Sequence, residues 1–189
     1  MTQSLVYRPL TRPEIDKLAY ISRSETIERV YTRQDDELIL QEEYIAVPDW
    51  SPREQQRRIA YLQEVFDKGA TFFGAFTGDR LAGLAVLDHN PVQTGRNRLQ
   101  LAGLWVSAPA RGQSVGRTLF QLAVKEAWNM GAEVLYISAT PSENTVRFYL
   151  NLGCRLADPV DPALLAKEPD DIHLELVLLR QTKQAARKS

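Results

Sequence analysis

Two continuous apolar segments of this chain, Ala70–Phe76 and Leu81–Leu87, are separated only by Thr77-Gly-Asp-Arg80. A short turn containing Gly and Asp between two such segments predicts an antiparallel β-hairpin. Because both segments are apolar at nearly every position, each strand has to be covered on both faces. We therefore expect this hairpin in the centre of a sheet that carries helices on its faces.

Further elements are predicted on both sides of this hairpin. Thr11-Arg-Pro-Glu14 and Ser51-Pro-Arg-Glu54 each combine an N-cap residue, an early proline and a capping glutamate, so they predict helices that run to about Ser22 and Lys68. Further strands are expected at Ser4–Arg8, Leu99–Val106, Val134–Ala139 and Ile172–Leu179, and further helices at Gly116–Met130 and Ser142–Leu152.

The helix expected at Gly116–Met130 has an apolar stripe opposite a polar row, and it joins the strand Leu99–Val106 to the strand Val134–Ala139. A crossover helix of this kind makes the two strands parallel. The predicted fold class is therefore α/β (α+β), a mixed, mostly antiparallel sheet with one parallel crossover and helices on both faces. Asp35–Glu37 predicts a turn, and Glu43–Val47 fits either a strand or an irregular loop.

Composition excludes several classes of protein. The chain has 189 residues, with 23 basic and 24 acidic side chains, and this balance argues against binding nucleic acid through a global basic field. One Cys and two His exclude a metal site rich in either residue. No apolar run approaches the ~20 residues of a membrane helix. We expect a cytoplasmic protein with one domain at 1–180, a basic, flexible tail at 181–189, and no nucleic-acid, membrane or metal partner.

A short loop rich in small residues lies between the strand that ends at Val106 and the next helix. Gly112, Ser114 and Gly116 let a ligand approach the backbone closely. The first turn of a helix carries unpaired N–H groups and the positive end of the helix dipole, so this loop can bind an anion such as a pyrophosphate. A strand-to-helix turn that merely needs flexible residues is the alternative. Two arginines flank the loop, Arg111 and Arg117.

The same loop, Arg111-Gly-Gln-Ser-Val-Gly116, resembles the Arg/Gln-x-x-Gly-x-Gly/Ala motif of the GNAT superfamily of acetyl-coenzyme A-dependent N-acetyltransferases, with Ser114 in place of the first Gly. A second segment, Thr145-Val-Arg-Phe-Tyr-Leu-Asn-Leu-Gly-Cys154, resembles the family's Phe-Tyr helix followed by Leu-Gly. The resemblance is specific over residues 99–155 and implies a GNAT-like acyl-CoA acyltransferase fold. It is weak over residues 25–65, where family members build their substrate sites.

The resemblance also implies which residues bind acetyl-CoA. Backbone amides of the loop would face the pyrophosphate, and the strand before the loop would pair with the pantetheine arm. The family separates its fourth and fifth strands to admit this arm, and we expect the separation to begin near Ser107 and Pro109. Ser142 occupies the place of a frequent family Asn and is expected to cap a helix. The implied cofactor-binding residues are Leu104, Val106, Arg111, Gly112, Gln113, Ser114, Val115, Gly116, Arg117 and Asn144.

Tyr149 aligns with the family's frequent general acid, since a phenol can protonate the departing thiolate. A core tyrosine that packs beside Phe148 is the alternative. The family's frequent basic Glu is replaced here by Gln100, and an amide is no base at neutral pH. No base is assigned. The alternatives are Asp88, His89, His173 and Glu175, of which the last two are equally compatible with solvated positions.

The resemblance implies transfer of acetyl from acetyl-CoA to a primary amine on a small molecule, a protein N-terminus or a lysine. Direct attack is expected because no activated nucleophile is visible, and Cys154 fits a buried structural thiol. A GNAT-fold sensor that binds acyl-CoA without turnover is the alternative, suggested by Gln100 and Ser114. Acidic residues at 35–37 and 158–171 suit either a cationic acceptor or solvated loops. The sequence is compatible with a homodimer.

Overall fold

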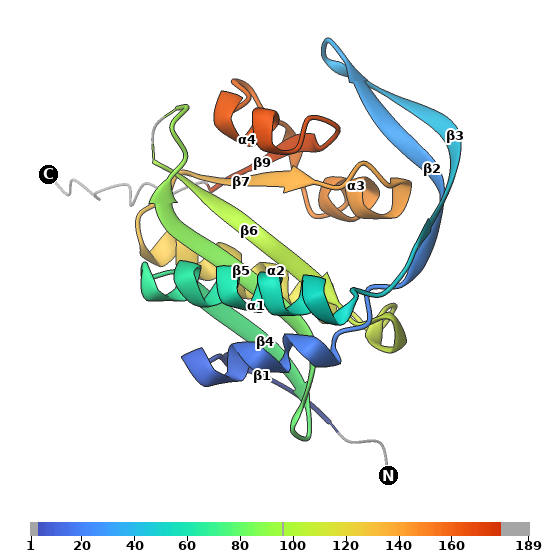
Figure 1. Cartoon of the computed structure of the whole chain (residues 1–189). Helices are drawn as coiled ribbons and strands as arrows, with labels where there is room; N and C mark the ends of the chain where they lie inside the picture. The colour runs from blue at the N-terminus through green and yellow to red at the C-terminus, as the bar shows by residue number, and fades with distance from the viewer. Residues whose placement is uncertain (1–3, 96, 179–189) are drawn as a thin grey trace, which may run out of the picture.

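The computed structural model describes residues 4–95 and 97–178, which form one seven-stranded sheet and one separate two-stranded sheet (Figure 1). The predicted tail at 181–189 lies outside the described residues. The strands are β1 (Leu5–Pro9), β2 (Glu25–Gln34), β3 (Glu37–Val47), β4 (Thr71–Thr77), β5 (Arg80–Pro91), β6 (Arg98–Val106), β7 (Val134–Ala139), β8 (Arg155–Leu156) and β9 (Ile172–Val177). The helices are η1 (Arg12–Tyr20), α1 (Pro52–Asp67), η2 (Ala108–Ala110), α2 (Val115–Asn129), α3 (Glu143–Leu150) and α4 (Pro162–Lys167).

The large sheet is mixed, with the strand order β1-β4-β5-β6-β7-β9-β8. Among its described strands only β6 and β7, which α2 connects, are parallel, and the other neighbours are antiparallel. The β4–β5 hairpin lies inside the sheet, between β1 and β6, as its apolar segments predicted. Apolar residues of η1 and α1 cover one face, and those of α2 and α3 cover the other (Figure 1). The predicted fold class is confirmed.

Both predicted capping boxes begin helices. The Ser51 hydroxyl accepts a hydrogen bond from the Glu54 N–H at 3.3 Å, and the Glu54 carboxylate accepts one from the Ser51 N–H at 2.8 Å. Thr11 and Glu14 form the same kind of box. The residues after Thr11 form a 3-10 helix rather than an α-helix. No helix within residues 4–95 and 97–178 is both long and apolar enough to cross a membrane.

Residues 25–47 form a long hairpin that the sequence showed only in part. The expected turn is present at Asp35-Asp36, and the strand alternative at Glu43–Val47 is correct but too short. Figure 1 shows β2 and β3, in light blue, arching away from the large sheet on the side of α3. Most side chains of β3 are exposed or half-buried, so the hairpin lacks the apolar run that marks a buried strand.

The C-terminal third contains two elements that the sequence analysis missed. α4 is a short helix whose N-cap, Asp161, accepts hydrogen bonds from the N–H groups of Ala163 and Leu164. β8 has two residues and extends the sheet beyond β9. Neither element is long enough to produce a hydrophobic period.

Candidate functional site

β6 and β7 pair over only a short distance and then separate. Their ladder joins Arg98–Leu101 to Val134–Ile137, while β6 continues to Val106. The separation therefore begins at Leu101, and the expectation that it begins near Ser107 and Pro109 was wrong. The cause is a β-bulge in β6.

At the bulge, Leu87 pairs with Leu101 and Val86 with Gly103, so Ala102 is an extra residue on β6. A bulge bends its strand and increases the local twist, which directs the rest of β6 away from β7. The two parallel strands therefore diverge beyond Leu101, and we call the region between their diverging ends the cleft. Beyond Leu101, β6 has a strand partner on only one side among the described residues.

The backbone of Leu104 and Val106 points into this cleft. The Ser107 N–H donates to Ala82 O at 2.8 Å, toward β5. Because successive residues of a strand point their backbone groups in opposite directions, Trp105 also faces β5. Leu104 and Val106 then face the other way, where an extended ligand can add itself to the strand edge.

The loop that follows β6 exposes its backbone. Gly112 has φ +75°, and a Cβ built on it meets no atom within 4 Å. Ser114 has φ 62° and is the N-cap of α2, in the left-handed conformation that the family motif reserves for Gly. Arg117 is exposed in the first turn of α2, whereas the Val115 side chain is buried, so Val115 can offer only its amide. Gln113 donates to Pro109 O at 3.0 Å.

Arg111 does not stand free beside the loop as expected. Its guanidinium donates to Val106 O at 3.2 Å, Ser24 O at 3.1 Å and Arg23 O at 3.1 Å. It thereby fastens the loop to the segment that leads into β2. Arg111 positions the loop, since its guanidinium is held by backbone carbonyl groups and by the Glu25 carboxylate at 3.5 Å.

β2 crosses the open end of the cleft from one arm to the other. Near its start, the Ala108 N–H donates to Ser22 O at 2.8 Å, on the β6 side. Farther along, the Tyr31 N–H donates to Pro141 O at 2.8 Å, just after β7. The sequence analysis did not place this segment at the cleft, because nothing in its composition indicates which strand ends it will join.

Two helical residues expected to bind or react lie on α3. Tyr149 is 5% exposed, and its ring centroid lies 5.8 Å from that of Phe120 and 5.1 Å from that of Phe148. Burial raises the pKa of the Tyr149 phenol. The phenol therefore stays protonated at neutral pH, and its proton is available to a strong base such as a departing thiolate. Asn144 is exposed in the first turn of α3. Ser142 caps this helix, as predicted, by accepting from the Thr145 N–H at 3.3 Å.

Cys154 is buried, and burial raises the pKa of its thiol to about 12. The thiolate is therefore scarce at neutral pH, and the prediction of a structural cysteine is confirmed.

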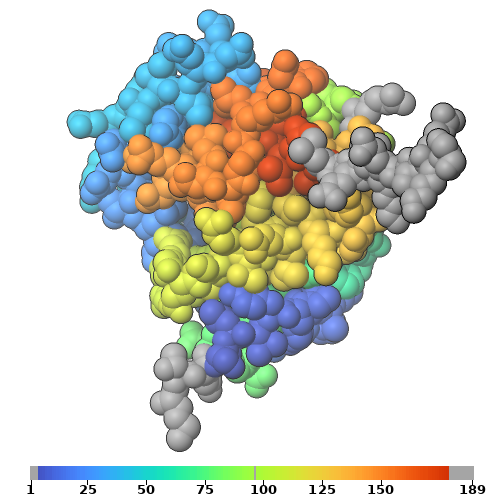
Figure 2. All heavy atoms as spheres, turned by 180° about the vertical axis from the view of Figure 1, so that it is seen from behind, coloured from blue at the N-terminus to red at the C-terminus, as the bar shows by residue number. Residues whose placement is uncertain are grey.

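In Figure 2 the residues of α2, in yellow, and of α3, in orange, form neighbouring parts of the rear surface.

The opposite face of β6, β7 and β9 is polar. The strand register puts Gln100, Tyr136 and Glu175 side by side on it, and Ser138 beside His173. His173 is 3% exposed and Glu175 is 2% exposed, so the solvated alternative for both residues was wrong. The neighbouring segment 157–161 folds over this face and buries these two side chains, and the sequence does not show this packing.

The four alternatives for a base have different surroundings. The Glu175 carboxylate accepts from Arg98 at 2.7 Å and from Arg155 at 2.8 Å, which commits it to a structural ion network. His89 is hydrogen-bonded to the Thr71 hydroxyl at 2.8 Å, and Asp88 accepts from Asn90. Among these four, only His173 lines a pocket described below.

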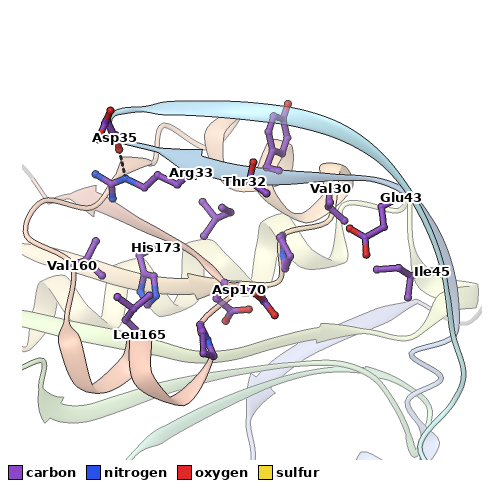
Figure 3. A pocket seen from close by; sticks show the side chains of 15 residues that line it. Val30, Thr32, Arg33, Asp35, Glu43, Ile45, Val160, Leu165, Asp170 and His173 are labelled. Atoms are coloured by element: carbon purple, nitrogen blue, oxygen red, sulfur yellow. Dashed lines mark hydrogen bonds between the residues drawn. The ribbon is translucent and has the colours of Figure 1, made fainter.

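A pocket of about 640 Å³ lies beneath the β2–β3 hairpin, next to the polar face (Figure 3). Asp171, which directly precedes β9, accepts a hydrogen bond from Ser138 at 2.7 Å. Burial raises the pKa of the Asp171 carboxyl group. The sequence showed Asp170 and Asp171 only as members of an acidic cluster. The pocket is lined by Val30, Tyr31, Thr32, Arg33, Asp35, Glu43, Ile45, Pro141, Val160, Leu165, Pro169, Asp170, Asp171, Ile172 and His173.

Comparison with solved structures gives the same overall architecture. Nourseothricin acetyltransferase superposes with a TM-score of 0.64 and 21% identity, covering 92% of this chain and 98% of that one. A candidate streptothricin acetyltransferase from Bacillus anthracis, solved with acetyl coenzyme A, has a TM-score of 0.65 and 16% identity over 95% of this chain and all of the other. PaiA N-acetyltransferase from Thermoplasma acidophilum, solved with coenzyme A, has a TM-score of 0.60 and 16% identity over 93% and 99% of the two chains.

Sequence comparison gives a curated relative and a family. N-acetyltransferase 8B of Rattus norvegicus is 29% identical over 101 residues, which span 52% of this chain and 46% of that protein. The family model described as "Acetyltransferase (GNAT) family" matches residues 28–154, which include the cleft, the loop and the helix with Tyr149. The resemblance inferred from the two motifs is thus confirmed, and the chain belongs to the GNAT family of acetyltransferases.

Proposed function

We propose that this protein is an N-acetyltransferase that transfers acetyl from acetyl-CoA to a primary amine by direct attack. One observation carries the proposal. At the bulge at Ala102, β6 separates from β7, and the loop that leads from β6 into α2 has an open backbone at Gly112 and Ser114. The acceptor is a small-molecule or protein amine.

The residues around the loop and cleft have the chemistry that acetyl-CoA requires. The amides of residues 112–117 stand at the positive end of the α2 dipole, which suits a pyrophosphate. The outward backbone groups of Leu104 and the N–H of Val106 suit an amide-containing arm that lies along the strand, while the Val106 carbonyl already accepts from Arg111. Asn144, in the first turn of α3, is proposed as a further contact.

Acetyl-CoA, when bound, supplies an acetyl thioester whose carbonyl carbon forms the new C–N bond with a neutral amine while the C–S bond breaks. The amine nitrogen loses one proton to water, and the sulfur gains one. The phenol of Tyr149 holds the proton that the sulfur needs on departure, and burial keeps that proton in place at neutral pH. Cys154 is too weakly ionised and too deeply buried to form an acyl-enzyme.

The direct test measures release of the coenzyme A thiol while acetyl-CoA and a panel of primary amines are present. The chain contributes only one cysteine, and that cysteine is buried, so the thiol reagent has a low background. Amine-dependent release with an acetylated amine in the mass spectrum is the expected result. Binding of acetyl-CoA without release for any amine would contradict turnover and support the sensor alternative.

A further inference from the structure

The pocket beneath the hairpin has one wall from β2 and β3 and another from α4 and the start of β9. In Figure 3, Thr32 and Glu43 approach it from the hairpin, and His173 and Leu165 lie on the opposite side. Ser138, at one edge of this region, is the residue after Ile137, where the β6–β7 ladder ends. The pocket therefore lies beside the place where the thioester is proposed to sit.

His173 lines this pocket, and its ring keeps a buried hydrogen-bond donor that is not used. The Tyr136 hydroxyl oxygen accepts from the Asp161 N–H at 2.9 Å and lies 2.8 Å from His173 Nδ1. Since the tyrosine proton has only Nδ1 as a described acceptor, Nδ1 accepts it, and the ring carries its own proton on Nε2. Burial also lowers the pKa of His173, which keeps the ring neutral.

The Nε2–H group of His173 is buried and has no hydrogen-bond partner within residues 4–95 and 97–178. A buried donor without a partner costs free energy, which a ligand oxygen can recover by accepting from it. A second buried polar atom among the described lining residues, the Thr32 hydroxyl oxygen, also has no partner there. Two lining residues therefore hold buried polar atoms that the described part of the chain leaves without a partner.

The same pocket carries negative charge close to the cleft. Asp171 is half-buried, and its carboxylate is held by Ser138, whereas Asp170 is exposed. Arg33, the basic residue among the lining side chains, is already engaged with Asp35 O at 2.7 Å and Ala157 O at 3.0 Å. An ammonium group entering the pocket therefore meets a carboxylate that is fixed in position.

We propose that this pocket selects an acceptor with two features. The first is a primary amine, whose ammonium form Asp171 binds before it loses a proton to water and attacks as the neutral amine. The second is an oxygen, in an amide or a hydroxyl group, that accepts from His173 Nε2–H. The inference rests on the proposed function and deepens it by naming the acceptor class. Acceptors are aminoamides or aminoalcohols, and plain alkylamines are poor ones. Asp171 and His173 thus determine specificity through direct contacts.

The test compares aminoamides and aminoalcohols of two to six carbons with alkylamines of the same chain length. For the parent protein we expect kcat/KM to favour the oxygen-containing amines by about 10-fold, as one hydrogen bond to a buried donor allows. Asp171→Asn should raise KM for every amine by roughly 10- to 100-fold, because it removes a charge-assisted contact. Asp79→Asn, in the exposed β4–β5 turn, is the matched control and should change nothing.

Two substitutions at His173 separate its contact with the ligand from its structural role. His173→Asn keeps an amide near the Nδ1 position for Tyr136 but removes the donor at Nε2, so the preference for oxygen should fall below about 2-fold. His173→Gln places an amide N–H near the Nε2 position and should restore much of the preference. Equal preferences in these two variants would overturn the assignment of His173. If either fails to fold, Asp171→Asn still decides the inference, because an unchanged KM contradicts it.

Calorimetric titration of the same amines into the protein with coenzyme A present gives a readout that needs no turnover. If the thiol is released but the amine affinities depend neither on the oxygen of the amine nor on Asp171, the inference fails and the proposed function stands. If no amine is acetylated but binding follows the predicted pattern, the proposed function fails and the pocket assignment stands. Uniform or absent amine binding in calorimetry contradicts the pocket assignment.

Discussion

Phe148 packs against the Cα atom of Gly116, so that a Cβ at Gly116 would lie 3.4 Å from two carbon atoms of the Phe148 ring. The same Cβ would lie 3.5 Å from a methyl group of Val106. The last glycine of the loop motif is thus the place where α2, α3 and β6 meet. The two motif segments are adjacent in space, and this glycine has a packing role as well as an open amide.

Gly112→Asp is expected to weaken acetyl-CoA binding, because a carboxylate would face the phosphates. Gly116→Asp is expected to weaken it for another reason, because its side chain would displace Phe148 and Val106 and so distort the loop. Gly112→Ala is the matched control, since it has the same backbone strain at φ +75° without the charge. The dissociation constant, measured by calorimetry, should rise at least about 10-fold more for Gly112→Asp than for Gly112→Ala. Parent-like binding by both Asp variants would mean that the loop is not the phosphate site.

Ser114→Gly is expected to stabilise the protein. Ser114 has φ 62° and ψ 10°, a conformation that costs a non-glycine residue about 1–2 kcal/mol. Glycine removes this strain but adds freedom to the unfolded chain, so the net gain should be roughly 0.5–1 kcal/mol. Urea unfolding measures it directly. A loss of stability would show that the Ser114 side chain makes a stabilising contact.

Tyr149→Phe is expected to lower kcat by roughly 10²–10⁴-fold, the usual loss for a missing general acid. Folding and acetyl-CoA affinity should barely change, since only one hydroxyl is lost from a buried ring. KM should change less than kcat, because proton donation acts in the transition state. The control is Tyr7→Phe on β1, outside the cleft. Parental turnover in the Tyr149 variant would leave this residue with a packing role alone.

Stability should fall as the pH decreases from about 4.5 to about 2, in part because of Glu14. Hydrogen bonds from Arg8, at 2.6 and 2.9 Å, and from Thr11 lower the pKa of the Glu14 carboxyl group from 4.5 to about 2. The folded state therefore prefers the ionised form, and this stabilisation is complete above pH 4.5 and disappears as pH approaches 2.

Glu14→Gln should flatten the pH dependence of the unfolding free energy over this interval by about 1–2 kcal/mol, a reduced value because Arg8 is partly exposed. Glu133→Gln, on the surface at the other end of the sheet, serves as the control. Identical slopes for the parent and Glu14→Gln would contradict the assigned pair.

Arg98→Ala is expected to destabilise the protein by about 3–5 kcal/mol, because it leaves Glu175 with one fewer partner inside the core. It also removes hydrogen bonds of 2.8 Å to both Pro159 O and Asp158 O. Arg155→Ala removes the other, 69% exposed partner of Glu175 and should cost much less. Comparable losses of unfolding free energy in the two variants would contradict this difference.

Local patterns in the sequence determined most of the large sheet and the loop before α2. The apolar segments beside Thr77–Arg80 predicted the central hairpin, and the two capping boxes predicted where helices begin. The stripe on Gly116–Met130 predicted the crossover and hence the parallel pair β6–β7. These features depend on neighbours within about ten residues, so side-chain period, cap and turn chemistry are sufficient to specify them.

Tertiary structure alone decided where β6 and β7 separate and what covers the cleft. The bulge at Ala102 depends on how β6 pairs with Val86 and Leu87 of β5. No local sequence pattern predicts that one strand of a pair will contain an extra residue. Asp171 and His173 fitted solvated positions in the sequence because their burial comes from other segments, the β2–β3 hairpin, which is far away in sequence, and the residues from 157 to α4. Contacts between distant segments decide burial, and burial decides which polar side chains keep an unused hydrogen bond for a ligand.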